Sequence, residues 1–199
     1  MAKIQIEDIK KLKELSGAGL TDAKKALEEA DGNFDKALEA MRKKGLTKAE
    51  KRGDRETRSG IVDSYIHSNR IGAMLELNCE TDFVAKTDDF KELAHYIAMQ
   101  IASMNPLYIS EADIPKSELS KVRKEFEDKL KDDKKPVEVK VKIIDGQVKK
   151  HFEEKVLLNQ QYILDDSMTV DAFIKTYIAK TGENITVKQF KRIELGVTE

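Results

Sequence analysis

The spacing of apolar residues changes near residue 61 of this 199-residue chain, and this change limits the folds open to it. In the first 46 residues, apolar side chains recur at helical spacing, which predicts amphipathic helices. From Ile71 to Cys79 they alternate with Gly72, Met74, Glu76 and Asn78, which predicts a strand with one clear apolar face. We therefore expect an α+β fold in which a small helical module precedes a core with an antiparallel sheet.

Residues 1–46 predict a module of three short helices. The glycine-rich stretch 17–19 is expected to end the first helix, and Thr21 is expected to cap the second. A turn signal at 31–33 precedes the third helix, which Gly45 is expected to end. Because the apolar faces are small and rich in alanine, we expect a slight core and a docking role.

Residues 47–60 are dense in charge and predict a solvated linker that is partly helical and lets the module move separately. A basic RNA-binding patch is the alternative, but acidic residues are interspersed with the basic ones. The linker therefore separates the helical module from a core that spans residues 61–199.

The core begins with a predicted β-hairpin of residues 61–67 and 71–79. A helix from about 82 to 104 follows, with a buried stripe at helical spacing. Towards the C-terminus, the pattern predicts a helix over 169–181 and a final strand over 184–195. Polar interruptions in that strand predict a bulge or an edge position.

A helical hairpin over about 115–155 is expected to project from this core. Its first helix carries only a narrow apolar seam on an otherwise charged surface, which is typical of a two-helix coiled hairpin. Val137–Ile144 is ambiguous, because its strict alternation favours a strand while its apolar residues also form a helical seam. We expect a helix, since an isolated strand here would have no obvious partner.

Composition excludes several function classes. Lys and Arg number 36 against 37 Asp and Glu, so the chain lacks the basic surplus of a nucleic-acid binder. Cys79 is the only cysteine, which excludes an intrachain disulfide and a multi-cysteine metal site. The longest uncharged stretch, 93–110, is interrupted by polar residues and is no membrane span. We expect a cytoplasmic protein without a metal or cofactor.

Catalytic signals are weak, since the chain has no phosphate-binding glycine loop and no serine elbow. A hydrolase that uses Cys79 and His67 as a nucleophile pair is one hypothesis, because the two lie on neighbouring predicted strands. Cys79 falls on the apolar face, however, where a buried structural thiol is the favoured interpretation. We therefore expect no enzymatic activity.

Residues 76–86 hold the most informative pattern. The strand ends at Cys79, Thr81 is placed to cap a helix, and Asp82 complements the positive end of that helix. Phe83 then falls in the first helical turn. It either packs against its own sheet or is presented beside a carboxylate as an interface anchor.

This pattern resembles a signature of the elongation factor Ts family. The match comprises residues 78–86, Asn-Cys-Glu-Thr-Asp-Phe-Val-Ala-Lys, and a second signature over residues 15–27. Further landmarks follow in order along the chain, at 65–67, 70–72, 182–185 and 194–196. The resemblance therefore spans essentially the whole chain.

The resemblance implies a guanine-nucleotide exchange factor for elongation factor Tu, with a ubiquitin-associated-like domain over residues 1–46. It implies that an exchange wedge enters the partner near its magnesium and phosphate site, made by Thr81, Asp82, Phe83 and Val84. His67 is implied to act on the phosphate-binding segment from the same end of the core. Docking is implied for Lys13, Leu20 and Lys24.

Members of this family have either one or two copies of the core, and the single copy here implies a homodimer. The rival hypotheses are the hydrolase and an adaptor that binds ubiquitin or RNA through its N-terminal helices or linker. Exposure of Phe83 discriminates against both, because neither needs a presented aromatic side chain.

Overall fold

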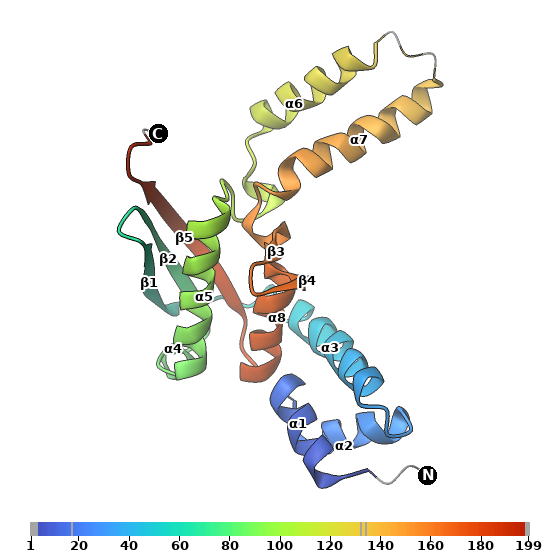
Figure 1. Ribbon diagram of the computed structural model, residues 1–199, viewed down its shortest axis with the longest axis vertical. Helices are drawn as coiled ribbons and strands as arrows, with labels where there is room; N and C mark the ends of the chain where they lie inside the picture. Colours follow the sequence, from blue (N-terminus) through green and yellow to red (C-terminus); the bar gives the residue numbers. More distant parts are fainter. Residues whose placement is uncertain (1–3, 17, 132, 134, 198–199) are drawn as a thin grey trace.

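The structure is a computed structural model that describes residues 4–16, 18–131, 133 and 135–197. Three N-terminal helices lie at one end of the molecule, and a three-stranded sheet with its covering helices forms the middle (Figure 1). A pair of long helices projects at the other end (Figure 1). This arrangement confirms the predicted α+β fold.

The N-terminal module consists of α1 (Ile6–Ser16), α2 (Leu20–Glu29) and α3 (Phe34–Glu50). Its small core is rich in alanine, with Leu12, Ala23, Ala26, Leu27, Ala37 and Met41 buried. The helix α1 ends before the glycine-rich stretch, as expected. Thr21 is not the cap of α2, because the helix already begins at Leu20 and Gly19 occupies the N-cap position.

The start of the predicted linker is helical and packs against the core. The predicted end of the third helix at Gly45 is wrong, because α3 continues to Glu50, while the helical residues 47–50 agree with a partly helical linker. Ala49 is buried in the main core against α8 (Val170–Thr181), and Glu50 lies 3.7 Å from the Lys175 ammonium group of that helix. Packing against α8 thus outweighs the helix-breaking tendency of one glycine.

The main sheet has the strand order β1-β2-β5, and all its neighbours are antiparallel. The strands are β1 (Ser59–His67), β2 (Ile71–Cys79) and β5 (Ile185–Glu194). The tight turn between β1 and β2 places Ser68 and Asn69 at positive φ, which confirms the predicted hairpin. The last strand lies at the edge, and its register with β2 shifts at Glu76/Leu77, which confirms the expected irregularity.

Among the residues that the structure describes, helices cover only one face of this sheet (Figure 1). The long helix α5 (Asp88–Met104) packs against β1 and β2, and α8 packs beside it and against β5. The predicted helix 82–104 is in fact two helices, because a short α4 (Asp82–Ala85) precedes α5. Thr87 separates them by accepting the Phe90 N–H through its side chain, as an N-cap residue does.

The projecting hairpin comprises α6 (Lys116–Lys129) and α7 (Val137–Glu153), so the Val137–Ile144 segment is helical as expected. Its base packs through Val122, Phe152 and Val156. A 3₁₀ turn at Glu111–Asp113 precedes α6. A second 3₁₀ turn, at Leu157–Asn159, and a small sheet that was not predicted connect α7 to α8. That sheet pairs β3 (Gln161–Tyr162) with β4 (Asp165–Thr169).

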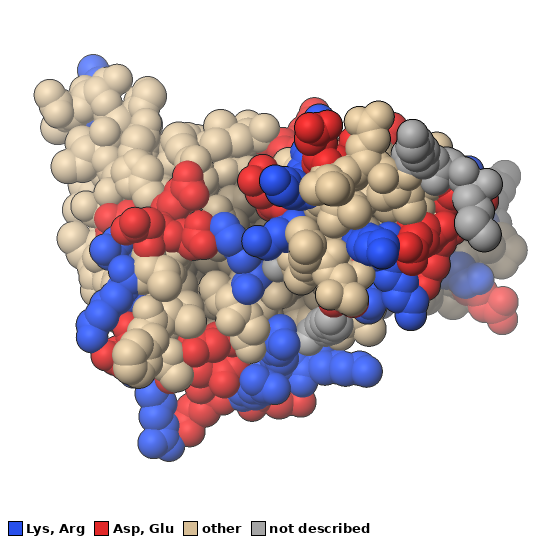
Figure 2. Space-filling view, turned by 90° about the horizontal axis from the view of Figure 1, so that it is seen from below, with Lys and Arg blue, Asp and Glu red and all other residues tan. Residues whose placement is uncertain are grey.

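Acidic and basic side chains are interleaved on the face seen in Figure 2. In several helices, acidic and basic side chains one turn apart form ion pairs, such as Lys43 with Glu39 at 2.8 Å. In the part of the chain that the structure describes, no helix has the length and apolar character needed to cross a membrane.

Candidate partner-binding site

The Thr81–Val84 motif lies where β2 ends and α4 begins. Thr81 is the N-cap of α4, and its hydroxyl oxygen accepts the Val84 N–H at 3.5 Å. Phe83 is 80% exposed, whereas Val84 is half-buried and Ala85 is buried. The motif is therefore anchored on one side and presents Phe83 to solvent, so the interpretation that Phe83 packs against its own sheet is wrong.

Asp82 is also exposed, and its carboxylate Oδ2 lies 2.6 Å from the Lys86 Nζ atom one helical turn away. The hydrogen bond from Lys86, and then the charge of that ammonium group, hold the pKa of Asp82 below its ordinary value. A carboxylate with a lowered pKa stays ionised at neutral pH. The motif therefore offers an anionic group and an aromatic ring at two consecutive exposed positions.

Three residues that were not among the predicted site residues support this motif. The Glu183 carboxylate accepts the Thr81 N–H at 3.0 Å and the Thr81 hydroxyl at 2.6 Å. In return, the Glu80 carboxylate accepts the Asn184 N–H at 2.7 Å. These contacts join residues about a hundred positions apart, so no local spacing in the sequence could have revealed them.

The segment that follows α3 is hydrogen-bonded to the core close to the Thr81–Val84 motif. The Asn184 side-chain amide donates to the backbone carbonyls of Gly53 at 3.1 Å and Arg55 at 2.8 Å. The Arg52 guanidinium donates to the Ile178 carbonyl at 3.1 Å, near the end of α8. Residues 52–55 are therefore hydrogen-bonded to the core, although residues 53–55 are exposed as expected of a solvated linker.

Cys79 and His67 do not form a catalytic pair. Cys79 pairs with Ser59 at one end of the β-hairpin, and His67 pairs with Ile71 at the other. At 3.4 Å per residue, these ends are about 27 Å apart. Burial raises the pKa of the Cys79 thiol to about 11, so it is neutral at neutral pH, and Sγ donates to the Thr81 carbonyl at 3.1 Å. The nucleophile hypothesis is wrong.

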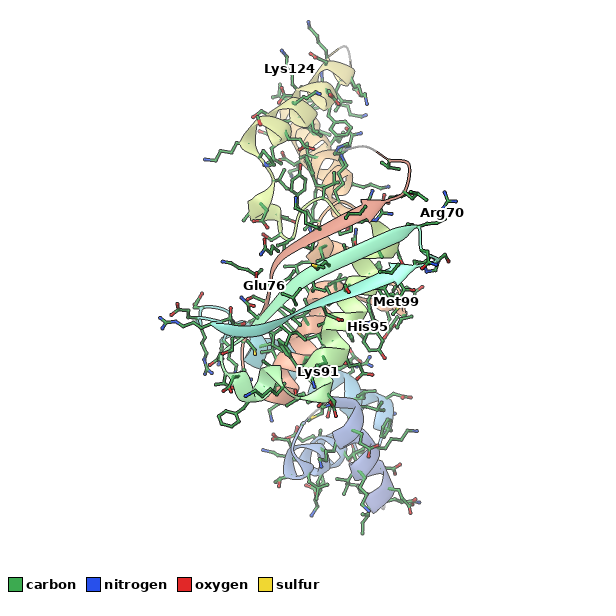
Figure 3. The ribbon with its side chains drawn as sticks, turned by 90° about the vertical axis from the view of Figure 1, so that its left-hand side faces the viewer. Arg70, Glu76, Lys91, His95, Met99 and Lys124 are labelled. Carbon is green, nitrogen blue, oxygen red and sulfur yellow. The ribbon has the colours of Figure 1, made fainter. Side chains whose placement is uncertain are left out.

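The pairing of β1 with β2 also corrects the predicted position of His67. The side chain is exposed beside the β1–β2 turn, where Nδ1 lies 3.1 Å from the Tyr65 hydroxyl. Arg70 marks this turn in Figure 3, and Lys91, in α5, lies towards the other end of the core. His67 and Phe83 thus lie at opposite ends of the core, and the expectation of a common end is wrong.

The three predicted docking residues all lie on the N-terminal module. Lys13 is exposed on α1, and Leu20, at the start of α2, is 56% exposed. Lys24 lies one turn after Leu20 and pairs with Glu28 at 3.7 Å on the helix surface. The module and α4 lie at the same end of the molecule (Figure 1).

Comparison with known proteins assigns the chain to a family. The model of the family described as "Elongation factor TS" matches residues 1–197. Elongation factor Ts of Thermotoga petrophila is 49% identical over 195 residues, which cover 98% of this chain and 97% of that protein. Elongation factor Ts of Fervidobacterium nodosum is 47% identical, with 98% and 99% covered. The chain belongs to the elongation factor Ts family.

Proposed function

We propose that this protein is a cytoplasmic guanine-nucleotide exchange factor that promotes GDP release from elongation factor Tu. The observation that carries the proposal is the exposure of Phe83, which is 80% accessible beside the ionised Asp82. A large aromatic side chain held at a surface is a typical interface anchor. An adaptor acting through the N-terminal helices, or a hydrolase, would have no use for it.

The proposed mechanism needs no covalent chemistry. An exchange factor binds the nucleotide-free partner more tightly than the GDP-bound partner, and linkage then weakens GDP by the same factor. Each tenfold weakening requires about 1.4 kcal/mol of differential contact. Complete burial of one Phe side chain supplies roughly 1.5–3 kcal/mol, so Phe83 alone can account for a tenfold effect.

In this proposal, Asp82 and Phe83 insert near the magnesium and phosphate site of the partner, as the resemblance implies. A wedge there displaces magnesium ligands and the phosphate-binding loop without touching GDP. Thr81 and Val84 hold the wedge in place, because Thr81 caps the helix and Val84 faces the core. The protein therefore acts by shifting a binding equilibrium and not as a catalyst of bond cleavage.

The N-terminal module supplies affinity in this proposal. Lys13, Leu20 and Lys24 are exposed on neighbouring helices at the end of the molecule that also carries α4 (Figure 1). One partner can therefore contact both surfaces. The apolar Leu20 side chain and the two ammonium groups form a small mixed surface, which suits reversible docking.

We also propose that the protein is a homodimer joined through the open face of its sheet. Figure 3 shows this face, with α5 and α8 behind the strands. Val62, Ile66, Met74 and Ile193 lie on it and are 55–75% exposed. The register aligns Ile66, Gly72 and Ile193 across the three strands, so the apolar side chains form one patch. A second copy would cover both the patch and the neighbouring edges.

The position of His67 explains why the proposed function would require a dimer. One copy cannot bring His67 and Phe83 to the same phosphate site, because about 27 Å of strand separates the ends that carry them. In a dimer, one partner molecule can contact Phe83 of one copy and His67 of the other. His67 would then act on the phosphate-binding segment as the resemblance implies.

The proposal is tested by the release of a fluorescent GDP analogue from purified elongation factor Tu in a stopped-flow instrument. We expect the release rate to rise with the concentration of this protein and to saturate. Pull-down with and without GDP should show tighter binding in its absence. A release rate that does not change at any concentration would contradict the proposed function.

A further inference from the structure

We infer that Glu183 is a positioning residue for the Thr81–Val84 motif, and that Asn184 connects this support to the segment leading from the N-terminal module. The inference rests on the proposed exchange function, because it concerns how Asp82 and Phe83 are held. Neither Glu183 nor Asn184 belongs to the surfaces assigned to the partner above.

The support is a reciprocal pair of carboxylate contacts, which we call the carboxylate clamp, made by Glu80, Thr81, Glu183 and Asn184. Glu183 accepts two hydrogen bonds from Thr81, at 2.6 Å from its hydroxyl and 3.0 Å from its N–H. Glu80 accepts the Asn184 N–H at 2.7 Å. Hydrogen bonds to ionised carboxylates are stronger than neutral ones, so the end of β2 is firmly joined to the start of β5.

The clamp acts on the part of the motif that core packing does not hold, because Thr81, Asp82 and Phe83 are exposed while Val84 and Ala85 pack against the core. The helix α4 has only four residues, which is too short for a helix to be stable by itself. Phe83 is 80% exposed and therefore gains little from packing within its own chain. The backbone direction at Thr81 consequently decides where Asp82 and Phe83 point. Glu183 fixes that direction by holding both the N–H and the hydroxyl of Thr81.

The clamp is also connected to the N-terminal module. Asn184 is only 2% exposed, and its side chain donates to the carbonyls of Gly53 and Arg55. The Arg55 guanidinium in turn donates to the Glu80 carboxylate at 3.4 Å. The segment that leads from the docking helices is thus hydrogen-bonded to the residues around the motif. This contact holds the N-terminal module at a fixed position relative to Asp82 and Phe83.

The test compares Glu183→Ala with Glu183→Gln and with Glu56→Ala, a control that removes one exposed acidic group near the same segment. We expect Glu183→Ala to lower the maximal rate of GDP release from elongation factor Tu about tenfold, the effect of about 1.4 kcal/mol on a barrier. Its half-saturating concentration should stay close to that of the unmodified protein. Glu183→Gln keeps one acceptor oxygen for the Thr81 N–H and has an amide group that can donate to the Thr81 hydroxyl oxygen, so it should restore most of the rate. Glu56→Ala should be unaffected.

Two results of this assay would overturn the inference. One is a folded Glu183→Ala protein, with an unchanged melting temperature, that exchanges at the rate of the unmodified protein. The other is a Glu183→Gln protein as slow as Glu183→Ala, because the acceptor oxygen would then contribute nothing. If Glu183 had a purely structural role, both variants would have a lower melting temperature. The maximal rate and the half-saturating concentration would then change together.

Hydrogen exchange in the free protein separates this inference from the proposed function. We expect the Thr81 amide to exchange about tenfold faster or more in Glu183→Ala than in the unmodified protein or Glu183→Gln. If the unmodified protein does not accelerate GDP release, the proposed function fails while this comparison still reports on the clamp. Equal exchange of the Thr81 amide in all three proteins would overturn the clamp itself.

Discussion

The Lys86 ammonium group contacts the Asp82 carboxylate at 2.6 Å across one turn, and the next residue after Asp82 is the exposed Phe83. The hydrogen bond and charge of Lys86 lower the pKa of Asp82. Because a lowered pKa favours the ionised form, Asp82 keeps its charge to more acidic pH than an unpaired aspartate. The group that the motif brings to a partner is thus a carboxylate and not a carboxylic acid.

Replacement of Lys86 should therefore raise the pKa of Asp82 towards its ordinary value. We expect Lys86→Gln to show this rise when the Asp82 carboxyl carbon is followed by NMR during an acid titration. Lys91→Gln, which removes a lysine near Asp88 at 3.8 Å, is the matched control and should leave Asp82 unchanged. An identical Asp82 titration in the Lys86→Gln protein would show that the ion pair does not form in solution.

The open sheet face predicts a dimer in solution. We expect sedimentation under reducing conditions to give a mass of about twice 22.6 kDa at micromolar concentration. Ile66→Lys should produce monomers, because a twofold interface would contain the introduced charge twice. Val141→Lys is the control, since it places the same charge on an exposed apolar residue of the projecting hairpin. A 22.6 kDa species for the unmodified protein would rule out the dimer.

Docking through the N-terminal module predicts a change in affinity without a change in maximal rate. We expect Leu20→Ala to raise the half-saturating concentration for elongation factor Tu roughly fivefold, which corresponds to about 1 kcal/mol of lost contact. Leu164→Ala, at another leucine that is more than half exposed but lies outside the module, should have no effect. If both variants behave alike, Leu20 is not part of the docking surface.

Cys79 provides a test of the core beneath the motif. Its thiol is fully buried, and burial raises its pKa to about 11. Because a raised pKa delays formation of the thiolate, a thiol reagent should modify the folded protein very slowly from pH 7 to pH 9 and the unfolded protein rapidly. A fast reaction in the folded protein would contradict the buried position.

Local signals in the sequence predicted some parts of this structure well. The Thr81 cap follows from one residue type at the end of a strand, and the β1–β2 hairpin follows from alternation on both sides of a short polar turn. Residues 137–144 were expected to be helical because an isolated strand there would have no obvious partner, and the helix is confirmed. The predicted apolar seam is buried only in part, since Ile144 and Phe152 are buried while Val137 and Val141 are exposed.

Long-range packing explains what the sequence could not show. Gly45 is a helix-breaking signal, yet α3 continues because Ala49 has a place in the core against α8. The support from Glu183 joins residues far apart in the sequence, so no spacing rule applies to it. The position of His67 is a different case, since the predicted antiparallel hairpin already placed it beside Ile71 and away from Phe83.

The central claim is that Phe83 acts on a partner and not on its own fold, and Phe83→Ala tests it most directly. A surface residue contributes little to stability, so the melting temperature should stay almost unchanged. Phe90→Ala is the matched control, because Phe90 is fully buried and its truncation should cost about 3–5 kcal/mol of folding free energy.

The decisive measurement is the rate of release of a fluorescent GDP analogue from elongation factor Tu, recorded by stopped flow together with a melting curve. We predict that Phe83→Ala lowers the maximal release rate at least about tenfold, the effect of about 1.4 kcal/mol, while the protein melts as before. A strongly lowered melting temperature with an undiminished release rate in the folded fraction would contradict the account.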